Sequence, residues 1–418
     1  MLPTSIYLHI PFCSHRCGYC DFNTYAGVEE LIPQYVDALC EEIQFLSSSL
    51  VNSPIVHTIF FGGGTPSLLS IEQLDQILSK LHTTWGVLPG VEITLEANPR
   101  SLSKSYLREL RSLNINRLSI GMQSANPDEL YKLERNHNHY EVINSIIWAR
   151  QVAFNNLNLD LIYGLPEQTL DQWKFNLEQA ILLNPEHLSL YSLTIEHGTP
   201  FGNWTKRGLM VIPDPDLAAD MYEWSFERLE KENYIQYEIS NWARPFTQGL
   251  TADQAGIKCC VHNLQYWRNL PYLGLGAAAH GYFDGYRLAN VLSPKAYIER
   301  LLSNTSSQLE ENCFTVATSS SAITPATQSV IKTDKVSEIA ETMMMGLRLV
   351  NEGVSNEIFF NRFGIELNDV FREPITRLIL SGLVEWASDN PENLRLTRKG
   401  RLLGNVVFRE FLEPKLSD

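Results

Sequence analysis

Three cysteines near the start of the chain have a spacing that suits metal chemistry. Cys13, Cys17 and Cys20 form the pattern C-x3-C-x2-C directly after an apolar segment. Thiolates are soft ligands, so three of them in one short stretch fit a soft metal centre. A structural zinc site normally has four protein ligands, and no fourth cysteine occurs before Cys40. Three cysteines therefore favour a 4Fe-4S cluster that leaves one iron open for a ligand from outside the protein.

Two other interpretations of these cysteines remain open from the residues alone. The site could bind zinc with His9 or His15 as the fourth ligand. Alternatively, the three residues could be ordinary core cysteines. The spacing favours the cluster over both.

Polar residues and glycines follow several apolar segments that could be buried strands. Residues 60–66 read Phe-Phe-Gly-Gly-Gly-Thr-Pro, and the glycines would let the backbone approach a ligand closely. Three polar residues stand at or just after the ends of further apolar segments, namely Glu96, Gln123 and Asp160, and Arg135 follows Gln123 by twelve residues. Each alone is more often a surface or capping residue, but their shared position favours a common ligand.

Apolar segments alternate with amphipathic segments through the first half of the chain. Six segments are predicted strands: residues 5–10, 56–61, 92–97, 117–120, 156–161 and 187–192. Five segments between them are predicted helices: residues 32–48, 70–85, 103–113, 140–153 and 169–183. Such alternation produces a parallel sheet through right-handed crossovers. Six units suit an open partial barrel whose reactive groups gather at the C-terminal ends of the strands.

The cysteine motif resembles the signature of the radical SAM superfamily, whose members bind a 4Fe-4S cluster through three cysteines. In that superfamily, S-adenosylmethionine (SAM) chelates the open iron through its amino and carboxylate groups. The motif is similar to the branch that contains oxygen-independent coproporphyrinogen III oxidase and the heme chaperone HemW. This resemblance implies an α/β fold: a partial (β/α)6 radical SAM barrel with a sheet extension and a small C-terminal winged-helix-like domain.

The resemblance also implies which residues bind SAM. Tyr19 matches an aromatic residue whose backbone contacts the adenine. Gly63, Gly64 and Thr65 match a glycine-rich motif whose backbone binds the amino group. The other matching residues are Tyr7, Glu96, Gln123, Arg135 and Asp160. No residue is assigned a catalytic role, and we expect the protein to cleave SAM with an electron from a donor such as a flavodoxin or ferredoxin.

A second polar segment places His262, Asn263, Tyr266 and Trp267 in the pattern H-N-x-x-Y-W. A histidine, an amide and two aromatic residues can ligate iron and stack on a porphyrin. From the residues alone, such a histidine is more often a satisfied core residue. The pattern is similar, however, to a HemW signature implicated in heme binding, which implies a heme site with His262 as the leading axial ligand.

The segment before this motif, residues 243–261, is longer than the corresponding segment of relatives and contains Cys259 and Cys260. These cysteines could be extra heme or metal ligands. Adjacent buried thiols without a function are the favoured interpretation.

Four segments are predicted along the chain. Residues 1–245 form the radical SAM core, 246–303 an extension with the H-N-x-x-Y-W motif, 304–333 a linker rich in Ser and Thr, and 334–418 a C-terminal HemN-like domain. Short helices and a two-stranded wing are predicted in the last segment. A basic run at residues 395–401 could contact nucleic acid, but a solvated wing is favoured.

Composition restricts which partners and which cellular compartment the sequence predicts. The 418 residues carry a formal net charge of −15, which argues against a nucleic-acid partner. Apolar residues make up 44% of the chain and no long apolar run predicts a membrane span, although peripheral membrane contact stays open. Seven cysteines without a secretory signal indicate a reducing compartment, so we expect a cytoplasmic protein.

Three features favour a heme chaperone that transfers heme to an unknown acceptor protein, with the coproporphyrinogen oxidase as the alternative. The oxidase resembles a longer protein with an N-terminal arm, which is absent before the first predicted strand here. It also has a fourth cysteine where this sequence has Phe22. Finally, the motif at His262 is that of the chaperone. A regulatory protein with a vestigial cluster is a third hypothesis, and the complete set of polar residues argues against it.

Overall fold

The computed structural model describes residues 4–50, 52–246, 256–303, 322–388 and 390–414. It divides into two compact units: Met1–Ser225 with Pro271–Ile331, and Phe226–Leu270 with Lys332–Asp418. This division differs from the four predicted segments, because residues 226–270 group with the C-terminal part and 271–331 group with the barrel. Residues 304–321 of the predicted linker lie outside the described residues.

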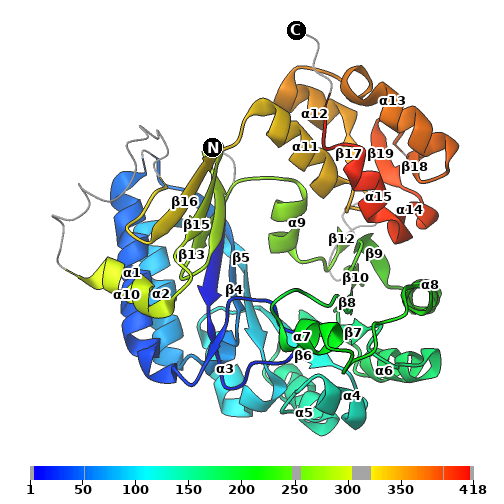
Figure 1. Ribbon diagram of the computed structural model, residues 1–418. Coiled ribbons are helices and arrows are strands. Elements are labelled where there is room, and N and C mark those ends of the chain that lie inside the picture. Colours follow the sequence, from blue (N-terminus) through cyan, green and yellow to red (C-terminus); the bar gives the residue numbers. More distant parts are fainter. Residues whose placement is uncertain (1–3, 51, 247–255, 304–321, 389, 415–418) are drawn as a thin grey trace. The chain divides into compact units, whose positions relative to one another are not determined.

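Six parallel strands form the centre of the first unit, as predicted (Figure 1). They are β1 (Thr4–Ile10), β4 (Ile55–Gly63), β5 (Gly86–Ala97), β6 (Arg117–Gln123), β7 (Leu157–Tyr163) and β8 (His187–Ser192), paired in that order. Five of these strands are buried over most of their length, and β5 in its second half. Residues 92–97, 117–120, 156–161 and 187–190 alternate polar and apolar residues, whereas residues 58–61 of β4 are mainly apolar. The C-terminal strand ends therefore share one edge, where the predicted ligand-binding residues lie.

The predicted helices are present: α1 (Ile32–Ser49), α2 (Ile71–Thr84), α3 (Lys104–Ser112), α5 (His139–Gln151) and α6 (Leu170–Leu182). Three of them, α2, α5 and α6, begin with a capping box such as Ser70 with Gln73, which satisfies backbone N–H groups at the first turn. Two short helices were not predicted: α4 (Pro127–Lys132) and α7 (Pro200–Lys206). Phe201 on α7 packs against Tyr19, with ring centres 6.2 Å apart.

The first unit has a sheet extension on the other side of β1. β13 (Tyr272–Leu275) runs parallel to β1, and β14 (His280–Phe283), β15 (Tyr286–Asn290) and β16 (Thr327–Lys332) follow in sheet order. A buried carboxylate, Glu42 on α1, joins this extension to the helical layer. It accepts hydrogen bonds from Gly276 N at 2.9 Å and from the hydroxyl of Tyr297 on α10 (Pro294–Leu302) at 2.6 Å. Full hydrogen bonding offsets the cost of burying this group.

The second unit contains a helical domain around one apolar core. Its elements are β9 (Ile235–Glu238), β10 (Asn241–Ala243), α9 (Val261–Trp267), α11 (Lys335–Gly346), β17 (Val354–Ser355), α12 (Asn356–Phe363), α13 (Leu367–Leu380), β18 (Val384–Trp386), β19 (Asn393–Leu396), α14 (Arg398–Leu402) and α15 (Gly404–Arg409). The wing has three strands rather than the predicted two, because the short strand β17 also pairs with β19. A two-residue strand is too short to show a period in the sequence.

The basic run at the wing makes contacts within the chain. Arg395 pairs with Glu385 at 2.9 Å and Arg398 pairs with Glu227 at 2.9 Å. Arg401 donates to the amide oxygen of Gln236 at 2.8 Å. These positive charges therefore have partners in the folded chain.

Candidate functional site

One cavity of about 430 Å³ in the first unit brings the predicted cluster and SAM residues together. Its lining includes the three motif cysteines and eight of the nine predicted SAM residues: Tyr19, Gly63, Gly64, Thr65, Glu96, Gln123, Arg135 and Asp160. The ninth, Tyr7, is outside the lining, and its hydroxyl lies 3.0 Å from Nδ1 of His9. The ends of β4, β5, β6 and β7 supply most of these groups, as expected for a parallel sheet.

The three cysteines lie in a loop anchored at both ends. Two short parallel strands, β2 (Phe12–Cys13) and β3 (Tyr25–Ala26), pair across the base of this loop. Cys20 N–H donates to Cys17 O at 3.2 Å, which closes a turn between the second and third cysteines. Cys13 and Cys17 are buried, Cys20 is half-buried, and all three are free thiols.

Donors from other elements reach the thiols. The hydroxyl of Thr65 donates to Sγ of Cys13 at 3.6 Å, and Nη1 of Arg135 donates to Sγ of Cys17 at 3.7 Å. Burial raises the pKa of Cys13, and the hydrogen bond from Thr65 opposes that effect. Hydrogen bonds and a nearby guanidinium stabilise thiolate charge, which is the form that binds metal.

The donor set fits an iron–sulfur cluster. No three His, Cys, Asp or Glu side chains in the described part of the chain are placed to hold a single metal ion. In a 4Fe-4S cluster each thiolate binds a different iron, so the three sulfurs need not converge on one point. His9 also lacks a free ring nitrogen, since Nε2 lies 3.0 Å from Asn23 O and Nδ1 faces Tyr7. Zinc binding by His9 would therefore require one of these contacts to break.

The glycine-rich turn packs directly on the cluster loop. Gly64 N–H donates to Ile10 O at 2.9 Å, and a Cβ at Gly64 would lie 2.6 Å from Phe12 O. Gly63 has φ of 108°, a conformation that favours glycine. Thr65 N–H donates to Phe12 O at 2.8 Å, which holds the turn against the base of the loop. The glycines therefore bring backbone and cysteines close together in a way that side chains would prevent.

Two carboxyl groups face the same cavity. Glu96 at the end of β5 accepts a hydrogen bond from Gly63 N at 3.1 Å. Burial, reinforced by nearby Asp160, raises the pKa of Glu96 to about 8. Asp160 accepts from Ser119 at 2.9 Å and from Asn158 at 2.8 Å, and burial raises its pKa against these hydrogen bonds. A bound cation would favour the ionised form of both groups, and SAM carries positive charge on its sulfonium and amino groups.

Gln123 and Arg135 complete the cavity on the side of β6. Gln123 has φ of 63° at an irregularity between β6 and β7, so its backbone is strained at the site. Arg135 donates through Nη2 to Gly121 O at 3.1 Å, while its buried Nε has no partner among the described residues. A buried N–H without a partner is costly, and the carboxylate of a ligand would satisfy it. The residues that line the cavity therefore fit SAM in addition to the cluster.

Several lining residues were not predicted: Asn98, Ser119, Tyr191, Ser192, Thr194 and Glu196. Residues 191–196 follow β8, so the rule that ligands gather at strand ends would have found them. Ser119 lies two residues before Gly121 on β6. Strand alternation therefore places it on the same face as the predicted residues.

The predicted heme residues lie in the second unit on the short helix α9. His262 is buried, and its Nε2 lies 2.8 Å from the hydroxyl of Tyr266, one helical turn later. Asn263 and Trp267 are half-buried. Cys260 is also buried, its N–H donates to the hydroxyl of Tyr237 at 3.2 Å, and Cys259 is half-buried. Residues 247–255 of the longer segment before the motif lie outside the described residues.

Comparisons with known proteins identify the family. Residues 7–180 match the model of the radical SAM superfamily, and residues 335–403 match that of the HemN C-terminal domain. The chain is 36% identical to the heme chaperone HemW of Bacillus subtilis, over 98% of this chain and 99% of that protein. It is 35% identical to the heme chaperone HemW of Lactococcus lactis, over 98% of this chain and 97% of that protein. The chain belongs to the HemW family. This result confirms the family that the cysteine motif predicted.

A solved structure supports the fold of this HemW family member. Coproporphyrinogen III oxidase (HemN) from Escherichia coli, described as a radical SAM enzyme, superposes with a TM-score of 0.78. The match covers 98% of this chain and 90% of that chain at 24% sequence identity. At that identity the likeness shows the fold alone, and it confirms the predicted radical SAM architecture with its C-terminal domain. No helix in the described part of the chain has the length and apolar character needed to span a membrane.

Proposed function

We propose that this protein is a heme chaperone: it binds a 4Fe-4S cluster, SAM and heme, and transfers heme to an acceptor protein. The observation that carries this proposal is the 36% identity to a protein named heme chaperone HemW along 98% of this chain. The cavity supports it, because cysteines, glycines and polar residues expected for cluster and SAM binding line one space. If the protein did not bind these cofactors, their chemistry would not require these residues to line one cavity.

In this proposal Cys13, Cys17 and Cys20 hold three irons of the cluster. SAM would be held in the cavity by Glu96 and Asp160, which suit its positive groups, and by Arg135, which suits its carboxylate. When bound, the cluster supplies one electron for reductive cleavage of SAM. The protein orients SAM and keeps the thiolates charged through donors such as Thr65.

Heme binds at α9 in this proposal, with His262 as the axial ligand. The imidazole Nε2 is hydrogen-bonded to Tyr266 in the structure, so coordination through this atom requires that the hydroxyl moves away. Tyr266 and Trp267 then provide aromatic surface for the porphyrin. Asn263 is proposed to orient the histidine.

The proposal includes a reducing compartment, which we take to be the cytoplasm. The six described cysteines are free thiols, which is typical of proteins in such a compartment. The partners are a heme acceptor protein and an electron donor such as a flavodoxin or ferredoxin. The negative net charge of −15 argues against nucleic acid as a further partner.

Anaerobic purification tests this function directly. Iron, sulfide and heme are quantified on one sample, and the heme-loaded protein is then mixed with a heme-free hemoprotein as acceptor. We expect one cluster per chain, bound heme and passage of heme to the acceptor. Failure of purified, cluster-loaded protein to bind heme would refute the proposal.

Coproporphyrinogen III oxidase activity is the alternative, supported here only by the fold of the solved relative. An anaerobic assay with reductant and excess SAM, run beside an authentic oxidase, separates the two functions. We expect no protoporphyrinogen IX from this protein. Product in stoichiometric or greater amounts would establish the alternative.

A further inference from the structure

Arg348, just after α11 in the second unit, has a guanidinium without a hydrogen-bond acceptor among the described residues. Its contacts are aromatic: the guanidinium carbon lies 5.2 Å from the ring centre of Trp267 and 5.0 Å from that of Phe408 on α15. The side chain is half-buried, and burial lowers its pKa. An arginine offers five N–H donors, and burying them without acceptors is costly. This residue is therefore suited to bind an anion.

Trp267, the last residue of α9, provides a second donor at the same place. Its indole Nε1 is buried and has no hydrogen-bond partner in the described part of the chain. The ring that faces Arg348 thus belongs to a residue with its own unsatisfied N–H. A buried N–H without a partner, beside a guanidinium that has no acceptor in the described part of the chain, indicates a place for an acceptor from outside the chain.

The carboxylate whose charge acts on Arg348, Glu238 on β9, does not supply that acceptor. Its carboxylate is occupied locally, since it accepts hydrogen bonds from Ser240 N at 3.1 Å and from the side-chain amide of Asn241. It acts on Arg348 only through its charge. The guanidinium therefore keeps its N–H groups available while its charge is partly balanced.

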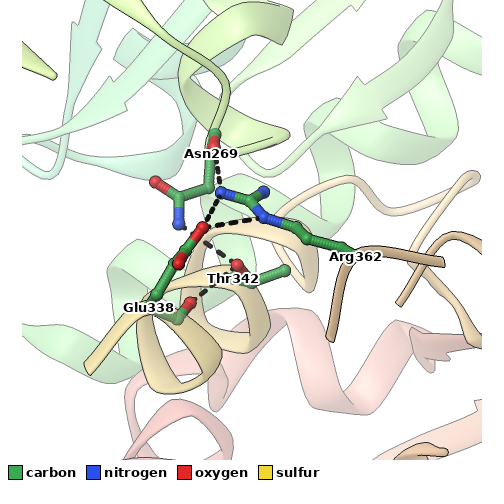
Figure 2. A network of polar contacts seen from close by, with 4 residues as sticks. All are labelled: Asn269, Glu338, Thr342 and Arg362. Atoms are coloured by element: carbon green, nitrogen blue, oxygen red, sulfur yellow. Dashed lines mark hydrogen bonds and ion pairs between the residues drawn. The ribbon is translucent and has the colours of Figure 1, made fainter. Parts of the chain in front are cut away.

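A polar network joins the residue Asn269, two positions after the end of α9, to α11 (Figure 2). Asn269, just after α9, donates to the hydroxyl of Thr342 at 3.1 Å and accepts from Arg362 at 3.0 Å. Arg362 also pairs with Glu338 on α11 at 2.6 Å. Arg362 and Arg348 therefore differ sharply: the first has acceptors on two elements, whereas the second has none in the described part of the chain.

We propose that Arg348 and the indole N–H of Trp267 form a carboxylate subsite that binds a propionate of heme. This inference rests on the proposed heme-chaperone function. Heme has two propionates on one edge, and a guanidinium binds a carboxylate through parallel hydrogen bonds. Trp267 belongs to the segment that carries the proposed axial ligand, so one short helix would contribute to binding both iron and carboxylate.

The test compares heme with its dimethyl ester, in which both propionates are blocked, by absorbance titration of cluster-loaded protein. Arg348→Met should bind heme about 10- to 100-fold more weakly than the wild type, the range for losing a charged hydrogen bond. Binding of the dimethyl ester should be the same for both proteins. Arg377→Met is the matched control, because it removes an equal charge from an exposed residue that pairs with Glu410. This control should bind heme as the wild type does.

A second variant covers the case that Arg348→Met does not fold. Trp267→Phe keeps an aromatic ring against Arg348 but removes the N–H, and it should weaken heme about 3- to 10-fold without changing ester binding. Equal weakening of both ligands would show that these residues only support the fold and would overturn the subsite. Unchanged heme affinity would overturn it as well. If the wild type bound neither ligand, the chaperone function itself would fail, which is a different result.

Discussion

The Nε2 atom of His262 lies 2.8 Å from the hydroxyl of Tyr266, one turn further along α9. The same atom is the natural donor of an axial bond to heme iron, so the tyrosine hydroxyl competes with heme for it. In the structure, the proposed ligand atom of His262 is thus already hydrogen-bonded. Heme binding then depends on the balance between one hydrogen bond and one coordination bond.

Tyr266→Phe should therefore bind heme more tightly than the wild type. A net hydrogen bond contributes about 1 kcal/mol, so its removal should strengthen binding about fivefold and leave the spectrum of an imidazole ligand unchanged. Absorbance titration measures both quantities. His262→Ala should lose that spectrum, whereas a Cys259→Ser, Cys260→Ser double variant should retain it. The reverse pattern would assign the ligand to a thiolate.

Cys17→Ser should lose most of the cluster iron. Its thiol receives a hydrogen bond from Arg135 and lines the cavity with the other two motif cysteines, and serine is a poor iron ligand. Iron and sulfide analysis after anaerobic reconstitution measures the loss. Cys40→Ser is the control, because that buried thiol on α1 is not among the residues that line the cavity. Full iron content in Cys17→Ser would exclude the assignment.

Arg135→Met should weaken SAM binding by about 1.5–3 kcal/mol, the contribution of a hydrogen bond to a charged group. The physical reason is its buried Nε, which finds no acceptor in the described part of the chain and lies at the cavity. Equilibrium dialysis of SAM against the cluster-loaded protein measures the change. Arg108→Met, at an exposed position on α3, should bind SAM normally. Equal affinity for the two variants would contradict the role of Arg135.

The strands of the barrel could be predicted because each is a short apolar run or a short run of alternating polar and apolar residues, such as 156–161. The extension β13–β15 could not, because residues 272–290 are rich in Gly and Ala and contain no such run. These strands form by pairing with β1, so their position depends on a tertiary partner far away in the sequence. Their attachment through Glu42 is equally invisible in the sequence, since its partners lie more than 200 residues away.

As with the fold, part of the candidate site could be predicted from the sequence and part could not. Glu96 and Asp160 follow apolar segments, and parallel strands bring such ends together. Tyr7 lies outside the cavity lining and contacts His9, because alternation along β1 places these two residues on one face, so its role at SAM stays a prediction. The contact between Arg348 and Trp267 could not be predicted, because these residues come from segments about 80 residues apart that meet only in the folded domain.

The last prediction concerns pH and Glu96, whose carboxyl has a pKa raised from its ordinary 4.5 to about 8. Between these values the folded protein holds a proton that the unfolded chain has released. The unfolded state therefore binds fewer protons, and stability falls as pH rises through this range. Glu96→Gln removes the dependence, so its stability advantage over the wild type in the absence of SAM should grow from pH 6 to 8 and then level off. We expect an advantage of about 1–3 kcal/mol at pH 9, because water in the cavity screens part of the penalty. Thermal unfolding of both proteins across this range measures it.

Glu238, with a pKa of about 7, acts in the same direction but is common to both proteins and cancels in the difference. Glu30→Gln, at an exposed position, should follow the wild type at every pH. A constant difference between Glu96→Gln and the wild type would show that Glu96 keeps an ordinary pKa in the cavity.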